Sequence, residues 1–414
     1  MFDRRQFVAG LAGTTVLAAP TVLRAQTAWD MPVPYTDGTY HTQNVRWWVD
    51  EIAKATNNGI KIQVHSNNSL IRLPEILRAV GSGQVAAGEI LISQFGNEDP
   101  IFELDSIPFL AQGFDQGQAL YAASKAALEA ACQRRGIRVL YSVAWPSQAF
   151  YSKTPINSAA DMRGMKFRTV SPITSRMAEL LGAVPTLVQA SEVPQAFATN
   201  IVTGMITSGA TGVQSRAWEF SSQFVNLRAS MPKNAVLVNE RAWQRLPEAV
   251  RKAMTEVSAK AEERGWKLAG EVETNSIEEL RKNGMTIVEP SAQLLTDVKA
   301  VGAKLTEEWI AKAGDTGRAG SRTSASASAP EPDEAEPPRR PGPPGPPPPR
   351  SPFLVMRAGR SHRGRRPRTS HAEITRPSLH RRRLGGRRMR ARHLHPDDGA
   401  GDPAARRRHD PRRR

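Results

Sequence analysis

The stretch DMRGMKFRTVSPITS, residues 161–175, predicts a turn, a short strand at 165–169 and the start of a helix. Ser171 and Pro172 suit the N-cap and the first position of that helix. Arg168 therefore stands at the carboxyl end of a strand, the edge where open α/β sheets bind ligands. Its planar guanidinium can hold both oxygens of a carboxylate. A surface Arg that merely ends a strand fits the same local pattern.

Two further motifs follow this stretch in close succession. LGAVP begins at Leu181, and SEVPQAFAT begins at Ser191. VTG, residues 202–204, opens a predicted strand at 202–206. Together with the strand before them, they resemble the solute-binding proteins of tripartite ATP-independent periplasmic (TRAP) transporters, the DctP family, over roughly residues 26–314. That resemblance implies capture of a small organic acid and transfer to a membrane permease. It also implies a periplasmic location and no catalytic activity.

The periodicity of the body predicts alternating strands and helices. Strands near 29–34, 60–64 and 85–92 enclose helices at 41–55 and 73–80, an order that predicts a parallel sheet covered by helices. The proline-free segment 248–282 favours one long helix. Further elements are expected at 114–134 (helix), 137–141, 236–239 and 284–288 (strands) and 291–312 (helix).

The resemblance implies a two-domain α/β fold of the periplasmic binding-protein type, each domain a mainly parallel sheet flanked by helices. Domain I would comprise residues 26–145 and about 234–272. Domain II would comprise about 146–233 and 273–314. The long helix would span both domains as part of the hinge.

The resemblance also implies where the ligand lies. Loops at Tyr35 and at Gln94 would line the pocket, and the segment 143–152 would cross between domains. Some relatives carry a second Arg near Gln148, which is absent here. That departure favours a monocarboxylate with an aromatic or branched body over a dicarboxylate. Trp145 and Phe150 could form an apolar wall, although Trp145 would equally suit a core position.

Thr207 falls where many family members have a ligand-binding Asn, and a Thr hydroxyl can still bond a carboxylate or hydroxyl. Turn formation at a strand end would explain Thr207 and Ser208 equally well. The expected binding residues are Arg168, Thr207, Ser208, Gln148, Trp145, Gln94, Phe95 and Tyr35.

The N-terminus, MFDRRQFV, joins paired arginines to an apolar run of small residues, as in an export signal over residues 1–25. The arginine pair favours the twin-arginine route over the general secretory route. The apolar run is too short for a membrane span. Cys132 is the single cysteine, so no internal disulfide can form.

The chain has 414 residues and a net charge of +17. About 25 of the Lys and Arg residues lie after Gly314, whereas the body before it is nearly neutral. Residues 315–414 are rich in Arg and Pro and lack a periodic apolar pattern, so we expect disorder. They would fit an out-of-frame translation of GC-rich DNA. A basic arm for nucleic acid or anionic lipid is the alternative.

The sequence contains no H-E-x-x-H, G-x-S-x-G, G-x-G-x-x-G or Walker motif. His41 and His65 are the only histidines before the tail. We therefore expect no enzyme activity, no metal and no cofactor. The expected partners are a small organic acid and the TRAP permease, without nucleic acid, and we expect a monomer.

Overall fold

The structure, a computed structural model, describes residues 27–328, with side chains described as far as Gly314. All described residues belong to one structural unit, residues 1–337. The expected export signal at 1–25 and the tail from 329 onwards lie outside the described residues. No helix in the described part is long and apolar enough to cross a membrane.

The first strands follow the predicted pattern. β1 (Thr27–Pro32) pairs in parallel with β2 (Ile60–His65), and α1 (Tyr40–Ala55) connects them. Residues of β2 alternate between buried and exposed positions, as expected for a strand with one covered face. α2 (Leu73–Ser82) then leads to β3 (Ala87–Leu91), which is buried along its whole length.

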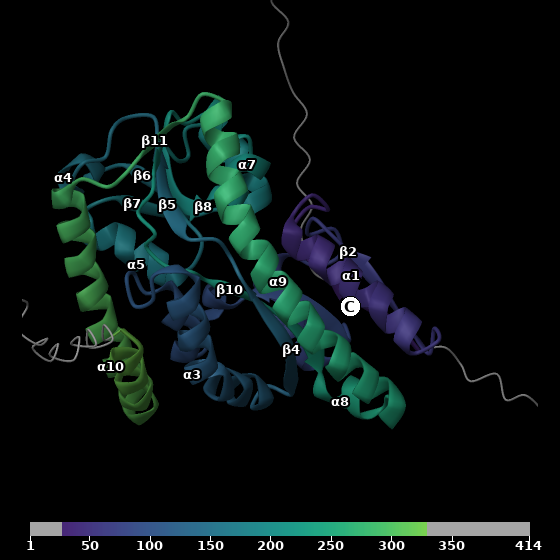
Figure 1. Cartoon of the computed structure of the whole chain (residues 1–414). Coiled ribbons are helices and arrows are strands. Elements are labelled where there is room, and N and C mark those ends of the chain that lie inside the picture. The colour runs from purple at the N-terminus through teal and green to yellow at the C-terminus, as the bar shows by residue number, and fades with distance from the viewer. Residues whose placement is uncertain (1–26, 329–414) are drawn as a thin grey trace, which may run out of the picture. The chain divides into compact units, whose positions relative to one another are not determined.

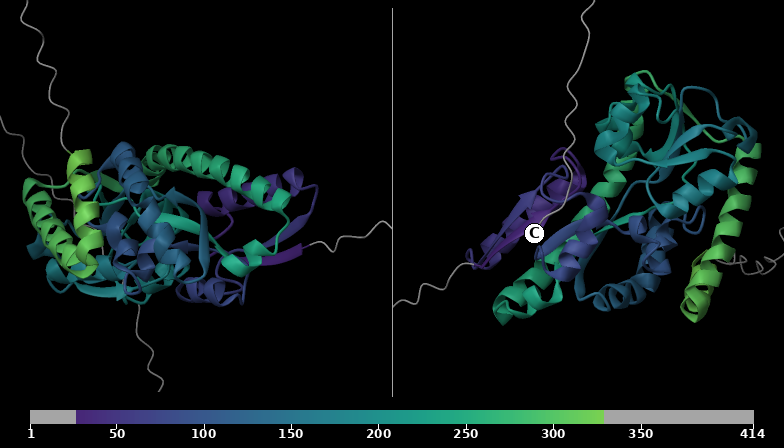
Figure 2. Two further views of the ribbon diagram at one scale, coloured as in Figure 1. Left: turned by 90° about the horizontal axis from the view of Figure 1, so that it is seen from below. Right: turned by 180° about the vertical axis from the view of Figure 1, so that it is seen from behind.

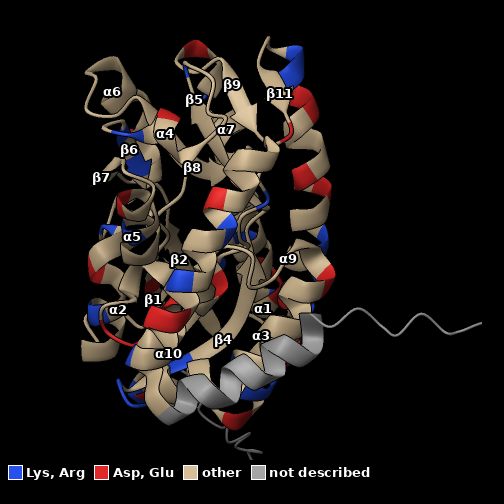
Figure 3. Cartoon of the chain, turned by 90° about the vertical axis from the view of Figure 1, so that its left-hand side faces the viewer, with Lys and Arg blue, Asp and Glu red and all other residues tan. Residues whose placement is uncertain are grey.

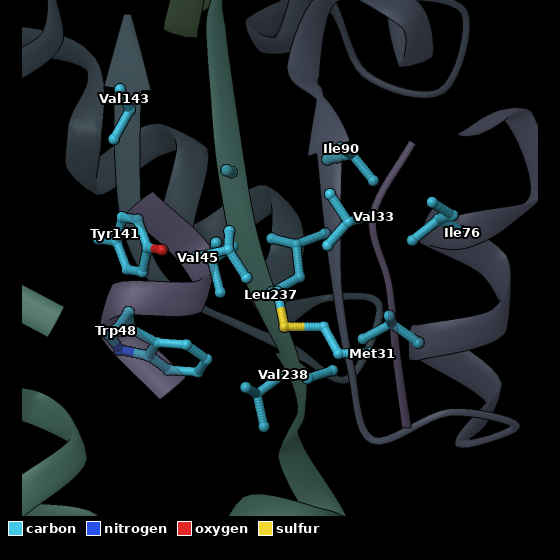
Figure 4. Packing of buried hydrophobic residues seen from close by; sticks show 14 of the residues in the cluster. Met31, Val33, Val45, Trp48, Ile76, Ile90, Tyr141, Val143, Leu237 and Val238 are labelled. Atoms are coloured by element: carbon cyan, nitrogen blue, oxygen red, sulfur yellow. The ribbon is translucent and has the colours of Figure 1, made fainter. Parts of the chain in front are cut away.

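The pairing of β3 corrects the predicted parallel arrangement. β3 pairs antiparallel with β10 (Lys233–Asn239), which also pairs antiparallel with β4 (Ile137–Ala144). Every residue of β10 is buried. Figure 4 shows Leu237 and Val238 of this strand among side chains from β1, α1 and β4. A strand that arrives from so far along the sequence therefore occupies the middle of this core.

The strands described so far form a two-stranded sheet, β1-β2, and a three-stranded sheet, β3-β10-β4. A further sheet in the described residues has six strands in the order β11-β9-β5-β8-β6-β7. β6 (Lys166–Thr169) pairs in parallel with β7 (Val184–Leu187) and β8 (Gly204–Ser208). β5 (Gln148–Ser152) runs antiparallel to β8 and to β9 (Gln223–Val225). β11 (Thr286–Val288) pairs in parallel with β9 at the edge.

The helices around this six-stranded sheet are mostly short. They are α4 (Ala159–Met162), α5 (Pro172–Leu180), α6 (Val193–Ala198) and α7 (Gly209–Gln214). α5 begins as predicted, with Ser171 at the N-cap, where its N–H donates to Thr174 Oγ1 (3.0 Å). Short segments of 3₁₀ helix lie at Ile92–Phe95 (η1), Pro100–Ser106 (η2), Ala190–Glu192 (η3) and Ala217–Glu219 (η4).

Three long helices complete the described fold, together with the short α8 (Glu240–Gln244). α3 spans Gly113–Gln133 and α9 spans Glu248–Lys282, close to the predicted bounds. α9 contacts α1 and β4 along one part and α7 along another (Figures 1 and 2). It therefore lies beside the three-stranded sheet and beside the six-stranded sheet. Glu273 of α9 also accepts the backbone N–H of Ser147 (3.0 Å), in the segment that joins β4 to β5.

α10 runs from Ala292 to Ser328, beyond the predicted end near 312. Its backbone leaves the helical region at Gly314 (φ 58°), where the composition of the chain changes. Acidic and basic residues both occur along α9 and α10 (Figure 3), in line with the nearly neutral body.

Candidate functional site

A small cavity lies where the carboxyl ends of β6 and β8 approach the segments that follow β1, β3 and β4. The centre of a water molecule can occupy about 40 Å³ of it, which is more than a single water needs. Residues from β3 of the three-stranded sheet, from β5, β6 and β8 of the six-stranded sheet, and from connecting loops surround it. The lining comprises Tyr35, Leu73, Leu91, Gln94, Trp145, Gln148, Arg168, Val170, Val188, Gln189, Ala190, Thr207, Ser208, Thr211 and Pro232.

Seven of the eight binding residues expected from the sequence belong to this lining. Phe95 does not. It is 5% exposed and packs into the hydrophobic core around β3, while its neighbour Gln94 faces the cavity. The tight 3₁₀ turn at η1 sends successive side chains in different directions. Phe150 is a second correction, because it lies in the core of the six-stranded sheet, edge-on to Phe167 at 5.3 Å between ring centroids.

Arg168 is held by the sheet edge itself. Its Nε donates to Val188 O (2.9 Å) and its Nη1 donates to Ile206 O (3.2 Å). Those carbonyls belong to the chain just after β7 and to β8, the strands on either side of β6. The guanidinium is thus fixed in orientation without any salt bridge. The side chain is 3% exposed, so the alternative of a surface Arg is wrong.

The charge of Arg168 has no acidic partner among the described residues. Burial lowers the pKa of its guanidinium to about 10, which still leaves it charged at neutral pH. Guanidinium has five N–H donors, and two of them bond to backbone carbonyls. Three N–H groups therefore remain for an anion in the cavity. Buried charges in proteins are normally paired, so this arrangement favours a negatively charged ligand.

Polar side chains surround the guanidinium. The hydroxyl of Thr207 and the amide of Gln94 form no hydrogen bond with other described residues, and both line the cavity. Gln148 Nε2 donates to Pro146 O (3.0 Å), which leaves its carbonyl oxygen available. Ser208 Oγ accepts the backbone N–H of Thr211 (3.4 Å) and so caps α7. Ser208 thus combines the turn role considered above with a place in the lining.

Two aromatic side chains, Tyr35 and Trp145, form an aromatic wall in the cavity lining. Tyr35 and Trp145 lie edge to face, with 5.0 Å between ring centroids. Trp145 Nε1 and Tyr35 OH both donate to Asn234 Oδ1, at 2.8 and 3.2 Å. Burial raises the pKa of the Tyr35 hydroxyl, so it is a neutral phenol beside Arg168. Trp145 is buried in the core, as one alternative suggested, and also faces the cavity.

Contacts across the mouth of the cavity join the elements on either side. Gln214 of α7 donates to Thr39 Oγ1 (2.6 Å) and also to Thr36, both just before α1. Arg72, before α2, forms an ion pair with Glu192 of η3. These bonds link the loops near the first strands to the six-stranded sheet.

Several lining residues had not been expected from the sequence. Val188 and Gln189 follow β7, a strand that had not been predicted, and Val170 follows β6 at the same edge. Recognising 184–187 as a strand would have placed Val188 and Gln189 at this edge. Within residues 27–314, no group of three or more His, Cys, Asp or Glu side chains lies close enough to hold a metal ion.

The fold and the enclosed cationic cavity define a two-domain α/β binding protein of the periplasmic type. Residues 34–313 match the family model "Bacterial extracellular solute-binding protein, family 7" (DctP), and the chain belongs to that family. The predictions of a TRAP solute-binding protein, an extracytoplasmic location and a non-enzymatic role are thereby confirmed. The residue boundaries predicted for the two domains stay a prediction.

Solved structures of this family resemble the chain closely. Two are DctP6 and DctP7, Bordetella pertussis extracytoplasmic solute receptors binding pyroglutamic acid. Each is 41% identical over 72% of this chain, covering 100% and 99% of its own length, with TM-scores of 0.72 and 0.71. A marine metagenome TRAP solute-binding protein specific for pyroglutamate is 31% identical over 73% of this chain and 99% of its own, with a TM-score of 0.71.

A more distant relative is named for a different ligand. The C4-dicarboxylate-binding periplasmic protein DctP of Rhodobacter capsulatus is 26% identical over 57% of this chain and 72% of its own length. The family thus includes proteins named for mono- and for dicarboxylic acids.

Proposed function

We propose that this protein captures a small monocarboxylic acid of the pyroglutamate type in the cavity at Arg168 and delivers it to a TRAP membrane permease. The observation that carries the proposal is the buried guanidinium, which has three free N–H donors and no acidic partner among the described residues. A carboxylate is the planar anion that fits this donor fork.

The charges around the cavity favour one carboxylate rather than two. Arg168 is the only charged side chain in the cavity lining as described. A second ligand carboxylate would be buried here without a cation, at a cost of several kcal/mol. A monoanion balances the site.

The remaining lining suits a ring that carries an amide. Pyroglutamate has a lactam, with one N–H donor and one carbonyl acceptor, between apolar methylenes. The free polar groups of Gln94, Thr207 and Gln148 can bond both ends of such an amide. Apolar side chains are available to cover the methylenes, namely Leu91, Trp145, Val170 and Pro232.

The relatives support the same ligand class. The three structures with 31–41% identity are described as binding pyroglutamate, and each is covered almost completely by this chain. Delivery to a permease follows from membership of the TRAP family. The contacts of Gln214 and of the Arg72–Glu192 pair would form as the cleft closes on its ligand and break as it opens.

Matched ligands test this proposal. Pyroglutamate, 2-pyrrolidinone and cyclopentanecarboxylate share a five-membered ring, but the second lacks the carboxylate and the third lacks the amide. At 100 times its Kd, pyroglutamate should stabilise the protein by about 2.7 kcal/mol, a rise in Tm of about 5 °C. Cyclopentanecarboxylate should bind more weakly, and 2-pyrrolidinone should cause no shift.

Two results would overturn the proposal. Equal shifts with pyroglutamate and 2-pyrrolidinone would show that the carboxylate is not recognised. A larger shift with succinate than with pyroglutamate would show a dicarboxylate site.

A further inference from the structure

A buried polar cluster lies directly behind the aromatic wall. His41, Glu89 and Asn234 are 1–2% exposed, and none of them lines the cavity. His41 comes from α1, and Glu89 and Asn234 come from β3 and β10, which pair in the three-stranded sheet. Polar groups buried this deeply are costly unless they are bonded, so their arrangement requires a reason.

Asn234 connects this cluster to the cavity. Its Oδ1 accepts two hydrogen bonds, from Trp145 Nε1 (2.8 Å) and Tyr35 OH (3.2 Å), which both line the cavity. Its Nδ2 donates to Glu89 Oε1 (3.1 Å). The amide can turn its oxygen towards both aromatic donors only if its NH₂ group meets an acceptor on the other side. Glu89 supplies that acceptor.

The other groups of the cluster are electrically neutral at pH 7. His41 Nδ1 lies 3.6 Å from Glu89 Oε1, and its ring is tilted by 46° against that of Trp145, with 4.3 Å between ring centroids. Burial holds the pKa of His41 well below its usual value and raises the pKa of Glu89 to about 8. Glu89 Oε2 and His41 Nε2 have no hydrogen-bond partner among the described residues. An ionised carboxylate would be poorly solvated there.

We propose that Glu89 and Asn234 are positioning residues, which hold Tyr35 and Trp145 in the orientation that fits the ligand and keep that wall free of negative charge. The inference rests on the proposed function, because it assigns the shape and selectivity of the same cavity to a second layer of side chains. Neither residue touches the ligand.

This arrangement makes affinity depend on pH. When Glu89 loses its proton, a negative charge appears behind the wall that faces an anionic ligand, and binding weakens as pH rises above about 8. With one proton linked to binding, Kd rises by up to about tenfold per pH unit. The ligand carboxylate itself stays ionised throughout this range.

Other groups near Glu89 do not titrate in this window. Burial raises the pKa of each neighbouring phenol and lowers that of the imidazole, so these remain neutral from pH 7 to 9. The neutral neighbours are Tyr35, Tyr40, His41 and Tyr141, and the charged groups beyond are Arg168, Arg264 and Glu273.

Two variants of Glu89 separate its role as a hydrogen-bond acceptor from its role as an ionisable group. Glu89→Gln keeps an acceptor for Asn234 but cannot ionise, whereas Glu89→Leu removes the acceptor. By calorimetry with pyroglutamate, the unmodified protein should bind more weakly at pH 9 than at pH 7. Glu89→Gln should lose this pH dependence and rescue most of the affinity at pH 7. Glu89→Leu should bind at least about tenfold more weakly.

A measurement without ligand keeps this inference separate from the proposed function. The indole N–H resonance of Trp145, assigned by its absence in Trp145→Phe, should shift with a midpoint near pH 8 and stay constant in Glu89→Gln. If pyroglutamate fails to bind but this shift occurs, the proposed ligand is wrong and the positioning role stands. A pH shift of the same size in Glu89→Gln overturns the positioning role, even if Glu89→Leu does not fold.

Discussion

Replacing Arg168 by Met tests the binding site with an unbranched side chain that carries no charge and no N–H donor. The change removes the only cation of the cavity lining. Loss of one partner of a buried, hydrogen-bonded charge pair costs about 2–5 kcal/mol of binding free energy. We therefore expect the Kd for pyroglutamate to rise by a factor of about 30 to 4,000.

In Arg168→Met, the free energy of unfolding of the ligand-free protein should change far less than the free energy of ligand binding. Burial lowers the pKa of Arg168 from its usual value to about 10. Below pH 10 the guanidinium is charged in both states, so its burial costs the folded state about 3 kcal/mol, and this cost is relieved only as pH rises through 10. Met removes the cost but leaves Val188 O and Ile206 O without their donor, about 1–3 kcal/mol each. The two effects nearly cancel.

Calorimetry with pyroglutamate and urea unfolding of the ligand-free protein measure the two quantities separately. Arg176→Met is the matched control, because Arg176 is a half-exposed residue paired with Glu308 outside the cavity lining. It should leave the Kd within about threefold of the unmodified value. An unchanged Kd in Arg168→Met would refute the site, and a stability loss above about 4 kcal/mol would make Arg168 a structural residue instead.

Three further predictions concern the body of the protein. A Cβ at Gly265 would lie 2.3 Å from Val143 Cγ2, whereas nothing lies within 4 Å of one at Gly270. Measured by urea unfolding, Gly265→Ala should therefore destabilise the folded protein by about 1–3 kcal/mol. Gly270→Ala should stabilise the folded protein by up to about 1 kcal/mol. The reverse order of stabilities would contradict the packing of α9. Burial raises the pKa of the Cys132 thiol to about 12, so mass spectrometry should find no alkylation by iodoacetamide at pH 8 in the native state and complete alkylation in urea. Equal rates in both states would refute its burial. A chain that ends at Gly314 should keep its affinity for pyroglutamate, since no residue of the cavity lining follows that position; loss of binding would favour a functional tail.

The sequence predicted the elements with strong periodicity well. α1 and α3 lie within a few residues of their expected bounds, because their apolar residues recur along one helical face. α9 matches the proline-free segment from which it was predicted. The short strands β7 and β9 were missed. β7 has only four residues and contains Pro185, so its sequence lacks both the length and the alternation of a typical strand.

Strand pairing could not be derived from local pattern. The periodicity of residues 85–92 indicates a buried strand, but it does not show that its partner is β10 rather than β1. The same limit affects the site. Arg168 was predicted from its place at a strand end, whereas Asn234 and Glu89 join the site only through that pairing, which sets Asn234 opposite Leu91.

Side-chain direction in turns was the other source of error. Gln94 and Phe95 are adjacent, yet only Gln94 reaches the cavity. The period of a strand or helix predicts which residues share a face, but an irregular turn has no such period. Residues predicted on strands, such as Thr207, therefore lie in the cavity lining, whereas Phe95 does not, and their binding of a ligand stays a prediction.

We propose that the guanidinium of Arg168 holds the carboxylate of a small acid inside the cavity. A crystal structure of the protein grown with pyroglutamate tests it most directly. We expect both carboxylate oxygens within about 3 Å of guanidinium nitrogens of Arg168, with the ring against Trp145. A ligand bound elsewhere, or bound in this cavity with its carboxylate turned away from Arg168, would contradict the account.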